Sequence, residues 1–282
     1  MPIAYPAILD LKTDEQRVVW NDKTSMLYAL GVGLGSDPLN EQELPFVYEN
    51  GLKALPTLAT VLTTPIELIA RSGVNFARVV HGEQFVELHQ TLPPEGEATG
   101  LSRVLAVYDK GADKGAIVLI ETALKDARGQ PLVTLKTSIF ARADGGFGGS
   151  SEGEAAPHTV PARAPDLSLD IPTRPDQALL YRLSGDRNPL HADPAFARMV
   201  GFPRPILHGL CTYGITCRAV MQAFTGFDPA PIRSHQARFS APLFPGETVT
   251  VDLWRDGEVV SFEARVKDRE AVVIRNGKSV LG

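Results

Sequence analysis

The chain has 282 residues, of which 44% are hydrophobic and 22% charged, a composition typical of a globular protein whose core needs neither disulfides nor a metal. Its net charge of −5 gives no electrostatic support for nucleic-acid binding. The sequence has no apolar stretch of about 18 residues that would span a membrane and no signal sequence at its N-terminus. We therefore expect a cytoplasmic protein without a membrane partner.

The first half of the chain begins with a helical, turn-rich part and continues with strand-like runs. Runs of β-branched and aromatic residues between turns predict β-strands, and they occur at residues 104–107, 116–121 and 132–140.

A glycine- and proline-rich segment follows at the middle of the chain. Residues 144–151 read Asp-Gly-Gly-Phe-Gly-Gly-Ser-Ser, and prolines recur at Pro157, Pro161 and Pro165. Glycine frees the backbone, and proline blocks the hydrogen bonds of helices and sheets. We therefore divide the chain into residues 1–143, a linker of residues 144–165 and residues 166–282.

The second half repeats the order of the first. Asp193 and Pro194 have the chemistry of a helix start, and Gly201 lies where that helix would stop. Residues 209–224 would place apolar side chains on almost every face of a helix, which predicts a buried helix. Strand-like runs follow at residues 238–243, 248–254, 259–266 and 271–274.

The two halves also resemble each other in detail. Residues 28–33 lead to Asp-Pro-Leu-Asn at residues 37–40, and residues 181–186 lead to Asn-Pro-Leu-His at residues 188–191. An offset of about 150 residues indicates a duplicated domain. The sequence thus predicts an α+β protein in which an antiparallel sheet wraps around one buried helix, twice.

Residues 185–191, Gly-Asp-Arg-Asn-Pro-Leu-His, form the densest polar group in an apolar context. The Asn188-Pro189 pair predicts a turn that brings Asp186 toward His191. A carboxylate and an imidazole that share a site suit acid–base catalysis, with Asn188 orienting a water between them. The alternative is structural, with Asp186 capping the turn and His191 packing on the next helix.

His208 and Gly209 immediately precede the predicted buried helix. A glycine at a helix N-terminus exposes backbone N–H groups at the positive end of the helix dipole, where they can polarise a carbonyl and hold an enolate. The alternative is that Gly209 only permits close packing. Because neither His191 nor His208 has a partner at a metal-ligand spacing, we expect no metal site.

Residues 181–191, followed by Ile-Leu-His-Gly-Leu-Cys at 206–211, resemble the hydratase 2 motif of MaoC-like (R)-specific enoyl-CoA hydratases. The resemblance covers nearly the whole chain. The chain also resembles the hydratase domain of peroxisomal multifunctional enzymes. It implies a double hot-dog fold and the hydration of (2E)-enoyl-CoA to (3R)-3-hydroxyacyl-CoA, or the reverse. It also implies an acyl-CoA substrate, no cofactor and, by analogy, a homodimer.

The resemblance also implies site residues. Asp186 and His191 would be the catalytic pair, with Asn188 beside them and the Gly209 N–H at the thioester oxygen. Substrate and CoA contacts would fall at His81, Gly82, Lys110, Asp186, Arg187, Asn188, Pro189, Leu190, His191, Gly209 and Phe239. Which of Asp186 and His191 is the acid and which the base stays open. The choice of Lys110 has an alternative in Lys114, because residues 113–115 repeat the Asp-Lys-Gly of residues 109–111.

The first half lacks the corresponding catalytic residues. Asn40 stands where the second half has His191, and Pro56 lies near the counterpart of Gly209. An amide is no base near neutral pH, and proline has no N–H to donate. We therefore expect the first half to bind the acyl chain and the second half to catalyse. Two other functions suit the same fold, an acyl-CoA thioesterase and a non-catalytic acyl-CoA-binding protein.

Overall fold

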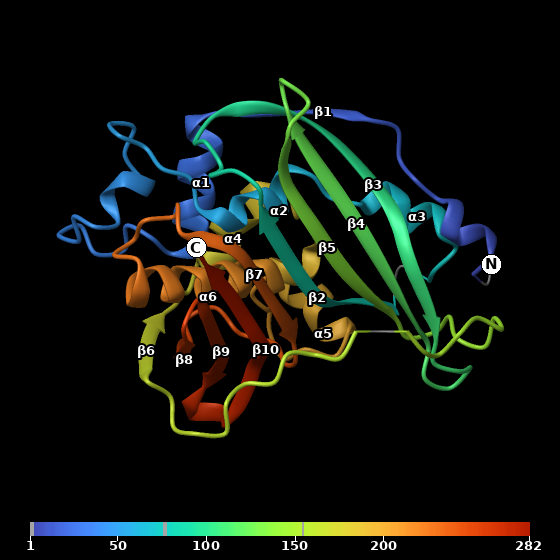
Figure 1. Ribbon diagram of the computed structural model, residues 1–282. Coiled ribbons are helices and arrows are strands. Elements are labelled where there is room, and N and C mark those ends of the chain that lie inside the picture. The colour runs from blue at the N-terminus through green and yellow to red at the C-terminus, as the bar shows by residue number, and fades with distance from the viewer. Residues whose placement is uncertain (1–2, 76–77, 154) are drawn as a thin grey trace.

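A single ten-stranded antiparallel sheet runs through both halves of the chain, in the order β1-β3-β4-β5-β2-β7-β10-β9-β8-β6 (Figure 1). It is seen in a computed structural model that describes residues 3–75, 78–153 and 155–282. The first half supplies β1 (Gln16–Trp20), β2 (Val79–Leu88), β3 (Gly96–Asp109), β4 (Ala116–Asp126) and β5 (Pro131–Ala141). The second half supplies β6 (Leu167–Pro172), β7 (Ile232–Phe239), β8 (Thr248–Asp256), β9 (Val259–Val266) and β10 (Ala271–Leu281).

The strand order confirms the duplication. The first half has the order β1-β3-β4-β5-β2 and the second half the equivalent order β6-β8-β9-β10-β7. The halves meet where β2 pairs with β7, with Glu83 opposite Arg238 at one end of the ladder and Glu87 opposite Ser234 at the other. The α+β fold predicted from the sequence is therefore confirmed, and both halves share one hydrogen-bonded sheet.

Six α-helices accompany the sheet in the described part of the chain: α1 (Asp22–Val32), α2 (Ala59–Leu62), α3 (Ile66–Arg71), α4 (Gln177–Tyr181), α5 (Pro194–Met199) and α6 (Gly209–Phe224). The longest, α6, has the predicted bounds, and residues 211–221 are all buried. The Asp193 side chain caps α5 by accepting from the backbone N of Ala195 at 2.8 Å, as predicted. No helix of the described residues has the length and apolar character needed to cross a bilayer.

The helical segment of the first half differs from the expected single buried helix. It is divided into α2 and α3, and residues 63–65 lie between them. Pro65 interrupts the segment because proline has no N–H for the helix ladder and its ring clashes with the preceding turn. Within residues 3–75 and 78–143, the first half therefore has no counterpart of the long α6.

Several strands also differ from their predicted bounds. The run expected at residues 238–243 overlaps a strand, β7, that ends at Phe239, because Pro242 cannot donate a ladder hydrogen bond. The strands β1, β2 and β6 were not predicted. In β2, charged residues such as Glu83 and Glu87 alternate with buried ones, which hides the apolar run.

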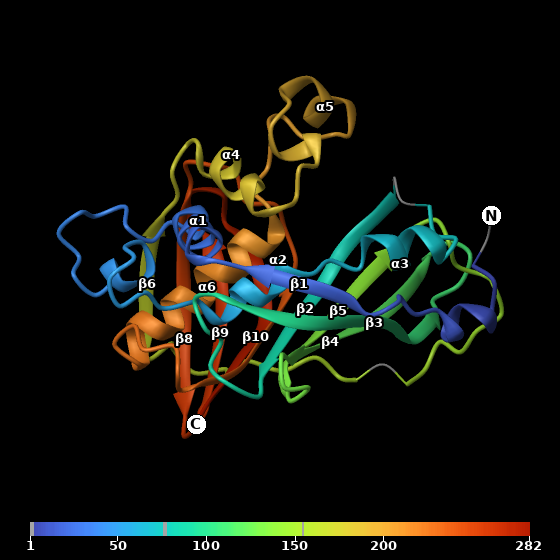
Figure 2. The same cartoon turned by 90° about the horizontal axis from the view of Figure 1, so that it is seen from above.

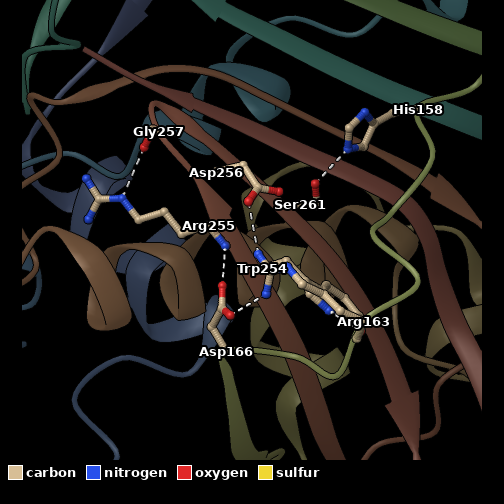
Figure 3. A network of polar contacts seen from close by, with 8 residues as sticks. All are labelled: His158, Arg163, Asp166, Trp254, Arg255, Asp256, Gly257 and Ser261. Carbon is tan, nitrogen blue, oxygen red and sulfur yellow. Dashed lines mark hydrogen bonds and ion pairs between the residues drawn. The ribbon is translucent and has the colours of Figure 1, made fainter.

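The linker follows the sheet on the side away from α4 and α5 (Figure 2), and its proline-rich end is tied down by a polar network (Figure 3). The Trp254 indole donates to Arg163 O at 2.8 Å. The Arg163 guanidinium pairs with Asp166 and, at 3.0 Å, with Asp256. His158 Nε2 lies 2.8 Å from the Ser261 hydroxyl oxygen. This end of the linker is thus fixed to β8 and β9.

Candidate active site

The polar segment at residues 185–191 forms the tight turn predicted from Asn188-Pro189. Asp186 Oδ1 accepts from the backbone N of Asn188 at 3.0 Å, and Asn188 Oδ1 accepts from that of Leu190, also at 3.0 Å. Pro189 and Leu190 open a single 3-10 turn, Pro189–His191. Each side chain therefore caps the next part of the turn, and the turn delivers His191 back toward Asp186.

The turn brings the two predicted catalytic side chains together. His191 Nε2 lies 3.8 Å from Asp186 Oδ2, and His191 Nδ1 lies 2.9 Å from the carbonyl oxygen of Ile206. Because a carbonyl only accepts, Nδ1 carries the proton and Nε2 keeps its lone pair. Burial lowers the pKa of His191, so the imidazole is neutral near pH 7. A neutral base thus faces a half-exposed carboxylate.

The structure adds His208, which the sequence reasoning considered only as a metal ligand. Its ring stacks on that of His191 with centroids 3.7 Å apart, and Tyr181 lies 4.9 Å away on another side. His208 Nε2 lies 3.1 Å from Asp186 O and donates to it. Burial lowers the pKa of His208 to about 3, so it stays neutral. The sequence indicated a position near the site only through the place of His208 directly before Gly209.

Asp186, His191 and His208 also bring potential metal-ligand atoms within 4.8 Å of one another. An imidazole nitrogen binds a metal in the plane of its ring, at about 2.0–2.1 Å for zinc. The two imidazole planes are stacked and inclined by only 26°, so an ion near both nitrogens lies outside at least one plane. The geometry of this group therefore suits proton transfer better than metal binding.

Gly209 is the first residue of α6, as expected. Among the described residues its backbone N has no hydrogen-bond acceptor, and the helix dipole concentrates positive charge at this end. A Cβ at this position would lie 3.3 Å from the ring of Phe239. Glycine thus keeps open the small space between the helix end and β7 in which a carbonyl oxygen can reach the N–H.

A β-bulge in β2 turns His81 toward the same place. His81 pairs with Ile139 and Glu83 with Ser138, so Gly82 is an extra residue in β2. His81 consequently shares the face of the buried Ile139, and its ring lies edge-on to Phe239 at 4.8 Å. Burial lowers the pKa of His81 to about 4, against a smaller effect of Asp186 that raises it. The structure therefore places His81 and Phe239 beside Gly209, with Gly82 next to them in the chain, while their contact with substrate stays a prediction.

Two predicted contact residues lie outside this cluster. Arg187 is exposed in the turn, and its carbonyl accepts from the Arg182 guanidinium at 3.2 Å. Lys110 follows β3, whose Val107 is in register with His81 through β4 and β5. With strands about 4.8 Å apart, Val107 is roughly 14 Å from His81, and Lys110 lies three residues farther still.

Two cavities differ in their relation to this cluster. One of about 220 Å³ reaches His191 and is also lined by Arg204, Ala192 and Leu179. The larger, of about 280 Å³, lies between the linker and the β2–β7 ladder, where Phe85, Lys136 and His158 line it. It shares no lining residue with the catalytic cluster. The smaller cavity therefore reaches the catalytic pair only at His191, since neither Asp186 nor Gly209 lines it.

Comparison with known proteins gives two family matches that together cover most of the chain. Residues 19–143 match a family described as the MFE-2 hydratase 2 N-terminal domain, and residues 157–276 match the MaoC like domain.

Full-length relatives agree with these matches. The chain is 42% identical to enoyl-CoA hydratase ChsH3 of Mycobacterium tuberculosis, over 100% of this chain and 99% of that protein. It is 35% identical to the peroxisomal enoyl-CoA hydratase 2 of Arabidopsis thaliana, over 98% and 94%. The crystal structure of a MaoC-like dehydratase from Phytophthora capsici superposes with a TM-score of 0.89 at 35% identity, covering 99% and 98% of the two chains.

Proposed function

The chain belongs to the family of MaoC-like enoyl-CoA hydratases of the hydratase 2 type, which are hydro-lyases, and on this premise we propose how its side chains perform (R)-specific hydration. The observation that carries the proposal is that His191 Nε2 and Asp186 Oδ2 lie 3.8 Å apart, close to the N-terminus of α6. Both atoms are acceptors, so a water between them can donate one hydrogen bond to each.

The thioester oxygen of the substrate accepts a hydrogen bond from the Gly209 N–H. Negative charge grows on this oxygen as water adds to C3, so the N–H and the helix end stabilise the enolate more than the ground state. His81 and Phe239 lie beside this position and hold the thioester against β7.

Proton transfer begins at His191. Its Nε2 takes a proton from the bound water while the water oxygen bonds to C3. The imidazolium then passes this proton to the Asp186 carboxylate, 3.8 Å away, which delivers it to C2. Both side chains thus return to their starting states, and the product carries the OH and the H of one water. Because both groups lie on one side of the substrate, hydroxyl and proton add to the same face. We propose that addition to this face gives the (3R) alcohol, which the resemblance to (R)-specific hydratases supports.

The N-terminal half (residues 1–143) would serve as a wall for the acyl chain, while residues 166–282 catalyse. The support is that the first half packs against residues that contact the catalytic cluster, which places it beside the site. Tyr28 of α1 packs against Tyr181, with ring centroids 5.9 Å apart, and Tyr181 in turn contacts His208. The buried Arg218 of α6 pairs with Glu43 of the first half at 2.5 Å.

The test is hydration of crotonyl-CoA and of a longer enoyl-CoA. The reaction is monitored by the loss of the enoyl absorbance, and the product is identified by chiral analysis. The expected product is the (3R) alcohol, with turnover strongly lowered in Asp186→Asn and no cofactor or metal needed. Release of free CoA thiol from saturated acyl-CoA would favour the thioesterase instead, and binding without turnover on any enoyl-CoA would favour the non-catalytic protein. We also propose a homodimer, for which light scattering should give twice the 30.4 kDa of one chain.

A further inference from the structure

The glycine-rich part of the linker folds around one buried carboxylate, that of Asp109 at the end of β3. Asp109 Oδ1 accepts from the backbone N of Gly111 at 2.9 Å and of Gly146 at 2.7 Å, and Oδ2 accepts from Gly148 at 2.8 Å. The backbone N of Asp109 donates to Ser150 O at 2.9 Å. The end of β3, the β3–β4 turn and the linker therefore meet at this side chain.

The glycines of this segment serve close packing rather than flexibility. A Cβ on Gly145 would lie 2.1 Å from the carbonyl oxygen of Gly111, and Gly146 and Gly148 have φ values of 83° and 85°, which disfavour other residues. Hydrogen bonds from Gly146 and then Gly111 lower the pKa of Asp109. The carboxylate is thus ionised at neutral pH with its acceptors turned to the loop.

The same loop fixes the direction of Lys110. Its backbone N donates to Gly115 O at 3.0 Å, and its Nζ donates to Ser151 O at 3.1 Å. The Nζ atom also lies 5.5 Å from the centroid of the Tyr108 ring. Because Ser151 belongs to the segment wrapped on Asp109, the position of the ammonium group depends on that carboxylate.

The distance from the reaction site suits the far end of the substrate. Val107 lies roughly 14 Å from His81 across the sheet, and Lys110 is three residues, or roughly 10 Å, farther along the chain, so the two backbones are roughly 17 Å apart. The pantetheine arm, from thioester to pyrophosphate, has about as many chain atoms as four extended residues, which also span roughly 14 Å. With the extended lysine side chain added to this span, a thioester held beside His81 and Phe239 lets the phosphates of CoA reach the Lys110 ammonium group.

We propose that Asp109 is a positioning residue for the nucleotide end of the substrate. It holds the glycine-rich loop so that Lys110 meets the phosphates of CoA, and it touches no substrate atom itself. This inference rests on the proposed function for the identity of the substrate.

The experiment compares Asp109→Asn with wild type on an enoyl-CoA and on the matching enoyl-pantetheine, which lacks the nucleotide. The asparagine turns one acceptor into an NH2 group that faces the Gly148 N–H. We expect KM for the CoA thioester to rise about tenfold, the effect of one weakened charged hydrogen bond. The kcat value and the KM for the pantetheine thioester should stay within about twofold of wild type.

Asp126→Asn is the matched control. Asp126 Oδ1 accepts from the backbone N of Arg128 and of Gln130, both at 2.9 Å, at the opposite end of β4. It has the same turn-capping chemistry but no role near Lys110, so both KM values should be unchanged. Lys110→Met should reproduce the phenotype of Asp109→Asn, and the double variant should be no worse than either single one.

Equal rises of KM for both thioesters, or no rise for either, would overturn the proposal. If Asp109→Asn fails to fold, Gly145→Ala displaces the same loop and must give the same selective loss. Calorimetry with CoA itself separates this inference from the proposed function. Weaker CoA binding by Asp109→Asn would support the positioning role even if the wild type hydrated no enoyl-CoA.

Discussion

His191 donates its Nδ1–H to the carbonyl oxygen of Ile206 at 2.9 Å, and this bond sets which nitrogen of the imidazole acts as the base. Ile206 lies three residues before Gly209, in the segment that leads into α6. The segment that presents the N–H for the thioester oxygen therefore also fixes the tautomer of the base. The two parts of the reaction site are built on one short piece of backbone.

Replacing Asp186 by Asn should lower kcat by about 10²–10⁴, the usual contribution of a positioned proton-transfer group, with little change of KM. Asp193→Asn is the control, because Asn caps a helix as well as Asp and Asp193 only caps α5. Steady-state kinetics on crotonyl-CoA measures both. Wild-type turnover by the Asp186 variant would place the acid–base group elsewhere.

The pH dependence of kcat/KM should follow the lowered pKa of His191. The base must be unprotonated, and burial moves its pKa below the ordinary value of about 6.5. Activity should therefore be constant through pH 7 and fall only below about pH 6.5. A midpoint at or above that value would contradict a buried neutral His191 as the base.

Gly209→Ala should lower kcat/KM because the new Cβ would lie 3.3 Å from the Phe239 ring and narrow the space for the thioester oxygen. We expect a loss of about tenfold or more, up to the 10²–10³ seen when an oxyanion donor is lost. The double variant Gly209→Ala/Phe239→Leu should recover part of it, since leucine gives back some of the space. If the double variant is no better than the single one, crowding by Phe239 is not the cause.

Asn40→His should add no second active site. Asn40 Oδ1 caps a turn by accepting from the backbone N of Gln42 at 3.1 Å, and the position matching Gly209 is occupied by the 3-10 turn that starts at Pro56. The turnover number per chain should equal that of wild type. A doubled value, or turnover by Asn40→His/His191→Ala, would refute the assignment of catalysis to the second half.

Acid should destabilise the chain through His235, which is fully buried between Ser279 Oγ at 2.6 Å and Thr216 Oγ1 at 3.0 Å. Burial lowers its pKa to about 3, whereas the unfolded value is about 6.5. Between these values the unfolded chain binds one more proton, so stability falls as pH falls, by about 1.4 kcal/mol per pH unit from this group. Denaturant unfolding at pH 7 and pH 5 measures the slope, and His235→Gln should reduce it.

The sequence predicted the catalytic turn well because its chemistry is local. Asn188-Pro189 dictates the turn, and five residues of chain are enough to bring Asp186 back to His191. The bounds of α6 followed from an equally local signal, the apolar surface between Gly209 and Phe224.

Long-range relations were not predictable in the same way. The bulge at Gly82, which turns His81 inward, depends on the register between β2 and β5 and leaves no periodic pattern. The role of Asp109 was hidden because its partners, such as Gly146, lie far along the chain and offer only backbone N–H groups. The stacking of His208 on His191 likewise needs the fold to bring two segments together.

The β2–β7 ladder, with Glu83 opposite Arg238, has a consequence for the halves taken apart. If residues 1–143 and 166–282 were produced as separate fragments, each would carry an exposed strand edge with unpaired backbone groups, a template for aggregation. Mixed during refolding, the fragments should cover each other's edges and restore turnover by complementation. The fused chain keeps these edges permanently paired within one molecule, which protects it from strand exchange with its neighbours.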